Sequence, residues 1–312
     1  MRQVSVREFG PPSVLEVVDA PDPTPGPGEV LVDVKAAHVL WVETAVRRGD
    51  GRDWFPLRAP YVPGTGVAGL EVGTGRRVVG HTGLGGGYAD RVVVDADRLV
   101  ALPDEVGFGA AAALVHDATT AQALFEVLQV DRQDHVLVIG ASGGLGLVSL
   151  QLTRRRARSV VALARDGRKI ARIEALGFDV VDTEAPDWPS AVRERLPDGA
   201  DVVLDNVGGA LGAQAVPLLA YGGRWAAHGR PGGSFSSIDE EQLTARGQRV
   251  VGLSAAQLPP ERRTRLIAEG LAMAARGELT PVVGQTFPLE KAADAHAAIE
   301  QRTVFGATLL VP

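Results

Sequence analysis

The most constraining feature of this chain is a glycine-rich turn between an apolar strand-like run and an apolar helix-like run, within residues 135–152. Residues 136–139 favour a β-strand, and the segment after the glycines has the length and composition of a helix. Ala141, Gly143 and Gly146 give the spacing Ala-x-Gly-x-x-Gly, which permits a tight turn and a close approach of backbone to ligand. A helix that begins at such a turn points free N–H groups and its positive dipole end at a pyrophosphate. The stretch therefore predicts a dinucleotide-binding βα turn, with a ligand-free turn as the alternative, and the residues expected at the dinucleotide are Ala141, Ser142, Gly143, Gly144, Leu145 and Gly146.

Length and composition favour a globular protein of two domains. The chain has 312 residues, more than a single hydrophobic core usually organises. Its net charge of −6 and its lack of a long basic block argue against nucleic acid as a main partner. The chain contains no cysteine, which excludes disulfides, thiolate metal ligands and a cysteine nucleophile. No apolar run approaches the roughly 20 residues that cross a bilayer, and the first residues lack the apolar core of a signal peptide, so we expect a cytoplasmic protein with no membrane partner.

The first part of the chain has the pattern of a β domain. Short β-type runs separated by Gly- and Pro-rich segments predict a compact antiparallel β structure. Strands are expected at residues 4–9, 14–18, 29–37 and 91–94, and a short helix is expected at 42–48.

From about residue 108 the pattern changes to alternating helices and strands. A helical run over 108–128 leads into this alternation, which predicts a parallel, doubly wound sheet. Strands are expected at 136–139, 159–163, 202–204, 224–228 and 250–254, with helices that include 167–176 and 189–196. The tail, with helices at 261–276 and 289–302 and strands at 282–287 and 307–311, is expected to fold back onto the first domain. The predicted fold class is α/β, with residues 1–115 and 256–312 in one domain and 116–255 in the other.

Longer motifs extend this interpretation over nearly the whole chain. They include PGTGVAG at 63–69, VLVIGASGGLG at 136–146, DVVLDNVGG at 201–209 and GELTPVVGQTFPLEKAADAHAAIE at 277–300. In these motifs the chain resembles the zinc-independent quinone oxidoreductase (zeta-crystallin-like) branch of the medium-chain dehydrogenase/reductase superfamily. The resemblance implies a GroES-like β domain, a Rossmann domain and an active-site cleft between them. It also implies a homodimer that pairs the edge strand at 250–254.

The segment after the second strand of the doubly wound sheet indicates which nicotinamide cofactor binds. NAD-using relatives carry Asp at the place of Ala164, whereas Arg165 and Lys169 match positions that hold the 2′-phosphate in NADPH-using relatives. Arg168 can add charge, and Asp166 would repel a phosphate unless it points away or pairs with an arginine. We therefore expect NADPH, with solvated cations at a helix start as the alternative. The nicotinamide half is expected at the carboxyl ends of later strands, beside Asn206, His228, Gly229, Leu253 and Ser254, with His228 a strand-end residue rather than an acid.

The places where zinc-dependent relatives carry their catalytic metal ligands hold other residues here. Leu40 stands at the first place, Thr65 and Gly66 stand where relatives carry His and Glu, and the last ligand falls near His116. One histidine with scattered carboxylates does not make a tetrahedral zinc site, so we expect no metal. The resemblance then implies that NADPH donates its hydride to a small molecule that is already electrophilic, such as a quinone or an α,β-unsaturated carbonyl.

The expected cleft departs from the quinone reductase pattern. Relatives often carry Asn at the place of Leu40 and Tyr at the place of Ala45, and both polar contacts are lost. His116 can act as a proton donor, with Asp117 or another carboxylate holding its tautomer, and Thr120 matches a family threonine; a purely structural histidine is the alternative. The expected pocket residues are Leu40, Trp41, Trp54, Phe55 and Tyr61. Two further functions stay open: an enoyl-thioester or specialised biosynthetic reductase of the same fold, and a non-catalytic NADPH-binding protein.

Overall fold

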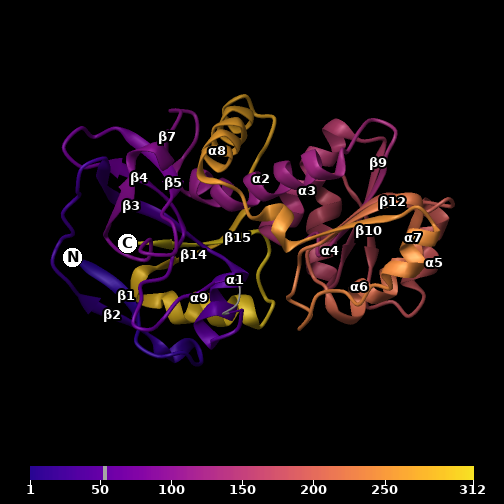
Figure 1. Ribbon diagram of the computed structural model, residues 1–312, viewed down its shortest axis with the longest axis horizontal. Coiled ribbons are helices and arrows are strands. Elements are labelled where there is room, and N and C mark those ends of the chain that lie inside the picture. The colour runs from indigo at the N-terminus through magenta and orange to yellow at the C-terminus, as the bar shows by residue number, and fades with distance from the viewer. Residues whose placement is uncertain (52–54) are drawn as a thin grey trace. The chain divides into compact units, whose positions relative to one another are not determined.

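In a computed structural model the chain forms two compact units, each built around a β-sheet (Figure 1). The structure describes residues 1–51 and 55–312. The first unit combines Met1–Thr119 with Pro259–Pro312, and the second unit is Thr120–Leu258. Helix α2 (Phe108–Leu128) contains the point where the first unit gives way to the second, so residues of one helix belong to both. The boundaries expected from the sequence lie after residues 115 and 255.

The second unit is a doubly wound parallel sheet, as the sequence predicted. Its strand order is β10-β9-β8-β11-β12-β13, and every neighbouring pair is parallel. The order runs outward from β8 on one side and from β11 on the other, so the carboxyl ends of these two strands flank a topological switch point. The strands are β8 (His135–Ile139), β9 (Ser159–Ala164), β10 (Asp179–Asp182), β11 (Ala200–Asp205), β12 (Leu219–Ala227) and β13 (Arg249–Gly252).

Helices cover this sheet and close its core. Leu137 and Ile139 of β8 pack in one cluster with Trp188 and Val192 of α5, because alternate residues of a strand point to the same face. Helix α3 contacts β8 and β9, and α4 contacts β10. The helices are α3 (Gly144–Arg156), α4 (Gly167–Ala175), α5 (Trp188–Arg195), α6 (Gly209–Ala215) and α7 (Glu240–Ala245), with short 3-10 turns η3 (Val216–Leu218) and η4 (Leu253–Ala256).

The first unit holds a mixed sheet with the order β14-β15-β3-β4-β5-β7, and β6 also pairs with β3. The C-terminal strand β15 lies antiparallel to β3, which places the tail of the chain in the sheet of the N-terminal region. The domain is not antiparallel throughout, because β14 and β15 are parallel. These strands are β3 (Glu29–Val39), β4 (Gly66–Glu71), β5 (Arg77–His81), β6 (Arg91–Asp95), β7 (Leu99–Ala101), β14 (Val283–Pro288) and β15 (Ala307–Val311), and β1 (Arg2–Val6) pairs with β2 (Leu15–Asp19) in a separate ribbon.

Helices and short turns complete the first unit. Helix α9 packs Ala292, Ala295 and Ile299 into the same cluster as Val34 and Leu310 of the sheet. The elements are α1 (Trp41–Arg48), α8 (Pro260–Ala275), α9 (Ala292–Glu300), η1 (Pro12–Val14), η2 (Ala96–Arg98) and η5 (Leu289–Lys291).

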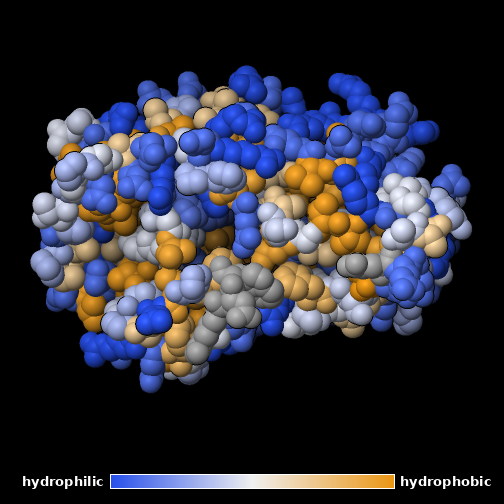
Figure 2. Space-filling model, viewed as in Figure 1, coloured by the Kyte–Doolittle hydropathy of each residue, from blue (hydrophilic) through white to orange (hydrophobic). Residues whose placement is uncertain are grey.

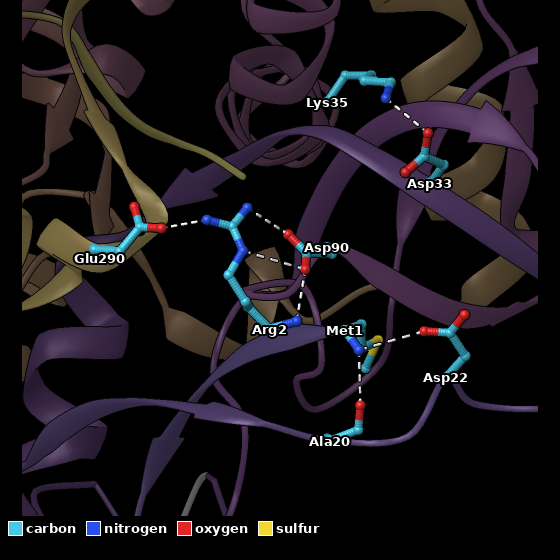
Figure 3. Close-up of polar contacts among 8 residues, drawn as sticks. All are labelled: Met1, Arg2, Ala20, Asp22, Asp33, Lys35, Asp90 and Glu290. Atoms are coloured by element: carbon cyan, nitrogen blue, oxygen red, sulfur yellow. Dashed lines mark hydrogen bonds and ion pairs between the residues drawn. The ribbon is translucent and has the colours of Figure 1, made fainter.

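Arg2 connects β1 to two later segments of the first unit (Figure 3). Its backbone N–H donates to Asp90 at 2.5 Å, and its guanidinium pairs with Asp90 at 2.8 Å and also with Glu290 of η5. The Arg2 side chain is 42% exposed, so these ion pairs add little stability and mainly fix the position of the strand.

The face of the molecule drawn in Figure 2 is mostly polar. Hydrophilic side chains cover much of the face seen in Figure 2, and apolar side chains interrupt them in smaller groups. In the part of the chain that the structure describes, no helix is both long and apolar enough to cross a bilayer.

Two predicted strands are too long at one end. The strand expected at 4–9 ends at Val6, where its partner β2 begins with Leu15. The strand expected at 250–254 ends at Gly252, which pairs with Ala227, the last residue of β12. Because no strand in the described part of the chain pairs with the other side of β13, this strand cannot continue past the end of β12, and the chain turns into η4.

The free edge of β13 generates a prediction about assembly. An edge strand presents unpaired N–H and C=O groups, and pairing with a second copy would satisfy them. We expect a homodimer, so light scattering at micromolar concentration should give twice the 32.7 kDa of one chain. Substitution of Val251 by Lys at this edge should shift the mass toward one chain, and a monomeric mass for the unmodified protein would contradict the prediction.

Candidate active site

In the second unit a glycine-rich turn joins β8 to α3, and its backbone is closely packed at Gly146. A Cβ atom on Gly146 would lie 2.4 Å from the carbonyl oxygen of Gly140 and 2.7 Å from the Cα of Ala141. A Cβ on Gly143 would meet only that same oxygen, at 3.9 Å. Gly146 therefore lets the helix pack on the turn, whereas Gly143 leaves open space in front of it.

The start of α3 offers donors to an anion. Gly143 is the N-cap residue, and no side chain caps this helix end. The first N–H groups of a helix lack partners within the helix, so those of Gly144, Leu145 and Gly146 can bind phosphate oxygens. Ala141 and Ser142 lie in the turn that leads there.

At the switch point, the side chains of Asn206 and His228 are hydrogen-bonded to each other. Asn206 follows β11, and its amide Nδ2 donates to the carbonyl oxygen of Ile139 at 2.9 Å. His228 follows β12, and its Nε2 lies 2.9 Å from Asn206 Oδ1. Burial lowers the pKa of His228, so the ring is neutral at pH 7. Its Nδ1 lies 3.2 Å from the carbonyl oxygen of Ala226, so both ring nitrogens face an oxygen that accepts, and the neutral ring can donate to only one of them. Gly229 donates its N–H to the carbonyl oxygen of Asp205 at 2.9 Å, which fixes the next residue of the loop.

The other predicted cofactor residues follow two different strands of the sheet, β9 and β13. Arg165 follows β9 and is exposed, as is Arg168, whereas the Lys169 residue is 8% exposed. Asp166 is the N-cap of α4, and its carboxylate accepts the backbone N–H of Arg168 at 3.0 Å. This capping role explains why a carboxylate, that of Asp166, stands among the cations Arg165, Arg168 and Lys169. Leu253 and Ser254 lie in η4 and not in β13, so only the strand assignment of these two residues was wrong.

In the first unit, the expected pocket residues take different positions. Leu40 is the N-cap residue of α1, and Trp41 begins that helix. Trp41 and Tyr61 are partly buried against the hydrophobic core of the unit, and burial raises the pKa of Tyr61 to about 12. Phe55 is partly buried, and Trp54 lies outside the described residues. Trp41 and Tyr61 thus contribute to the packing of this core.

The carboxylate of Glu43 is the centre of a buried hydrogen-bond network, and most of its members could not be predicted from the sequence. Its Oε1 accepts the backbone N–H and the hydroxyl of Thr65, at 3.0 and 3.2 Å. Its Oε2 accepts the backbone N–H of Leu40 at 2.9 Å and the hydroxyl of Tyr88 at 2.7 Å. The Tyr88 hydroxyl also lies 3.2 Å from Nε2 of His296 in α9. Burial raises the pKa of Glu43, and the hydrogen bonds it accepts oppose that shift.

His116 joins this network through Thr65. Its Nε2 lies 3.0 Å from Thr65 Oγ1, and a Cβ atom on Gly66 would lie 2.9 Å from its ring. The absence of a side chain at Gly66 thus makes room for the imidazole. Burial lowers the pKa of His116 well below its usual value, and the nearby rings of His81 and His38 lower it further. The ring is therefore neutral at pH 7.

Asp117 does not orient His116, because successive residues of a helix face different directions. Its carboxylate lies 3.8 Å from Nε2 of His38 instead. Burial raises the pKa of Asp117 to about 8 and lowers that of His38 to about 4, so both groups are uncharged at pH 7. Thr120 lies one turn further along α2, in the part that belongs to the second unit, and is partly buried.

One sequence signal pointed to part of this network. Glu43 stands at the third position of α1, where a carboxylate commonly reaches back to the N–H of the N-cap residue. Tyr88 and His296 lie far away in the sequence, and no local pattern marks them. Across residues 1–51 and 55–312, no group of three or more His, Asp or Glu side chains is arranged to hold a metal ion.

Comparison with known proteins agrees with this architecture. A sequence family described as zinc-binding dehydrogenase matches residues 176–310. The quinone oxidoreductase of Mus musculus is 31% identical, over 96% of this chain and 94% of its own length, and that of Homo sapiens is 30% identical with the same coverage. The solved structure of mycobacterial Rv1454c complexed with NADPH aligns over 100% of both chains, with a TM-score of 0.89 and 28% identity.

A doubly wound nucleotide-binding sheet joined to a separate mixed sheet defines the medium-chain dehydrogenase/reductase class, and the chain is an oxidoreductase of this type. Within that class it belongs to the quinone oxidoreductase, or zeta-crystallin-like, family.

The two glycines of the turn give a matched pair of predictions. Gly146→Ala places a methyl group against fixed backbone, so we expect a loss of about 1–3 kcal/mol in the free energy of unfolding, measured in urea. Gly143→Ala meets no close atom, so its free energy of unfolding should stay within about 0.5 kcal/mol of the unmodified protein. Equal losses in the two variants would show that the turn is packed differently.

Proposed function

We propose that the protein is a reductase that uses NADPH to reduce a quinone or an α,β-unsaturated carbonyl without the help of a metal ion. The observation that carries the proposal is the open turn at Gly143 before the uncapped start of α3, in a chain whose relative is complexed with NADPH. The family relationship to quinone oxidoreductases supports the acceptor class.

The residues of the second unit fit a dinucleotide. The free N–H groups at the start of α3 bind the pyrophosphate, and the space at Gly143 lets it approach. Arg165 is exposed after β9 and supplies a cation for the 2′-phosphate, while Asp166 is engaged as a helix cap. Asn206 and His228 stand at the switch point, where the nicotinamide half of such ligands binds. NADPH supplies the hydride.

The residues of the first unit fit the acceptor chemistry. Leu40 and Gly66 have no metal-ligating side-chain atom, so the acceptor must be electrophilic without a Lewis acid. Reduction of a quinone or an enone adds one hydride and one proton. His116 is partly exposed and is held by Thr65, and we assign it the transfer of that proton.

The proposal is tested by following NADPH oxidation with 1,4-benzoquinone, naphthoquinones and a panel of enones. We expect turnover with at least one of these acceptors. His116→Gln should lower kcat by about a hundredfold or more, because it removes the proton donor, while the Kd for NADPH stays unchanged. Tight NADPH binding without turnover of any acceptor would contradict the proposal and favour a non-catalytic NADPH-binding protein.

The cofactor preference has its own test. Arg165→Ala removes a charge-assisted hydrogen bond to the 2′-phosphate, so the Kd for NADPH should rise roughly tenfold to a hundredfold. The Kd for NADH, which lacks that phosphate, should not change. Arg193→Ala in α5 removes another exposed cation of the same unit and serves as the control. An equal loss for both cofactors would show that Arg165 does not contact the 2′-phosphate.

A further inference from the structure

A continuous line of hydrogen bonds runs from His116 to a buried carboxyl group. Nε2 of His116 lies 3.0 Å from Thr65 Oγ1, which lies 3.2 Å from Oε1 of Glu43. The three groups come from α2, from the residue before β4, and from the first turn of α1. A Cβ atom on Gly66 would lie 2.9 Å from Cδ2 and 3.0 Å from Nε2 of His116, so the lack of a side chain at Gly66 leaves room for the edge of the imidazole that faces Thr65.

The protonation of Glu43 determines the direction of every bond in this line. An ionised carboxylate only accepts, so Thr65 must give its single proton to Glu43. The Thr65 oxygen then accepts a proton from His116, which fixes the neutral ring as the Nε2–H tautomer. Nδ1 of His116 is left as an acceptor.

A Glu43 that carries its proton on Oε1 reverses every hydrogen bond in this line. The Oε1–H group donates to Thr65 Oγ1, and the Thr65 hydroxyl donates to Nε2 of His116. A neutral imidazole that accepts at Nε2 carries its proton on Nδ1. Residue His116 is partly exposed, so in this tautomer the Nδ1–H group is available to donate to an acceptor molecule.

We propose that Glu43 is the source of the proton that His116 delivers, and that Thr65 passes it between them. This inference rests on the proposed function. As NADPH reduces the acceptor by transfer of a hydride, the Nδ1–H proton moves to the acceptor oxygen, or to the carbon of an enolate. The Thr65 proton moves to Nε2, and the carboxyl proton moves to Thr65. Glu43 ends as a carboxylate and takes a new proton from water.

The relay explains how a neutral histidine can act as a proton donor. Burial disfavours the imidazolium form of His116, and the relay never requires it, because one proton arrives as the other leaves. Burial also favours the protonated form of Glu43 before the reaction. After the reaction, the N–H groups of Leu40 and Thr65 and the hydroxyl of Tyr88 stabilise the carboxylate.

With one exception, the other ionisable groups around Glu43, Thr65 and His116 do not change their protonation state near neutral pH. Around Glu43, burial raises the pKa of Tyr61 to about 12 and that of Tyr88 well above 10, while burial lowers the pKa of His296 to about 3; Arg47 pairs with Glu300. Around His116, burial lowers the pKa of His81 to about 3 and that of His38 to about 4, and Arg263 is a nearby cation. The exception is Asp117, whose pKa of about 8 follows from burial beside His38.

The tautomer of His116 is the direct test, and it needs no substrate. Long-range proton–nitrogen correlation spectra of nitrogen-15-labelled protein distinguish Nδ1–H from Nε2–H, and the loss of signals in His116→Gln assigns the ring. We expect Nδ1–H at low pH and Nε2–H at high pH, with the change following Glu43. Glu43→Gln should leave one tautomer at every pH, and Asp117→Asn should leave the change in place. A single tautomer throughout in the unmodified protein, or a change that survives in Glu43→Gln, would overturn the proposal.

Two substitutions of Thr65 form a matched pair for measuring activity. They test the relay without Glu43→Gln, so the proposal can be decided even if that variant does not fold. Thr65→Ser keeps the hydroxyl, so both the tautomer change and kcat should be retained within about threefold. Thr65→Val keeps the shape and removes the hydroxyl, so the tautomer should no longer follow pH and kcat should fall by about a hundredfold. Equal kcat in the two variants would show that the hydroxyl does not carry the proton.

A cationic acceptor, such as an N-methylphenazinium dye, separates failure of the relay from failure of the proposed function. It becomes neutral when it takes a hydride and needs no proton. Thr65→Val should therefore reduce the dye at the rate of the unmodified protein if the dye is a substrate. If no quinone or enone is turned over, the proposed function fails, and the spectra still decide whether Glu43 controls His116.

Discussion

The first unit depends on how a buried carboxyl group is satisfied. A polar group that is removed from water without partners costs several kcal/mol, and an ionised one costs more, so Glu43 requires its hydrogen-bond partners to stay in place in either protonation state. Those donors are the N-cap of α1, the residue before β4 and the hydroxyl of Tyr88, and Tyr88 in turn contacts His296 of α9. One side chain therefore fixes the relative positions of segments that lie far apart in the sequence. His116 is connected to the same group through Thr65, so the position of the proton donor that we propose depends on it too.

The second unit depends on a different constraint, the close approach of backbone to backbone at Gly146. With no side chain there, α3 can begin directly after β8, and its free N–H groups stand at the carboxyl end of the sheet. Asn206 and His228 meet at the neighbouring strand ends through a single hydrogen bond. In our proposal the two units divide the chemistry, since the second binds the hydride donor and the first supplies the proton.

The sequence was sufficient for the features that local patterns encode. The turn at Gly143 and Gly146 and the parallel sheet follow from spacing and alternation, and the structure contains both. The family relationship follows from the resemblance of the longer motifs, and the comparisons confirm it. Strand ends were less certain, because the end of β13 depends on where β12 stops. The partner of His116 could not be predicted from sequence neighbours: Asp117 is adjacent in the chain but faces His38, whereas Thr65 and Glu43 are distant in the chain and close in space. Only tertiary packing brings such groups together.

The central claim, that this protein transfers a hydride from NADPH to an electrophilic organic acceptor, is tested most directly by isotope transfer. The protein is incubated with a conjugated enone and with NADPH that carries deuterium at C4 of the nicotinamide, on one face or on the other, and the product is examined by mass spectrometry and NMR. Our account predicts that one of the two labelled cofactors places a single deuterium on the β-carbon of the reduced enone. A product that contains no deuterium with either cofactor would contradict it.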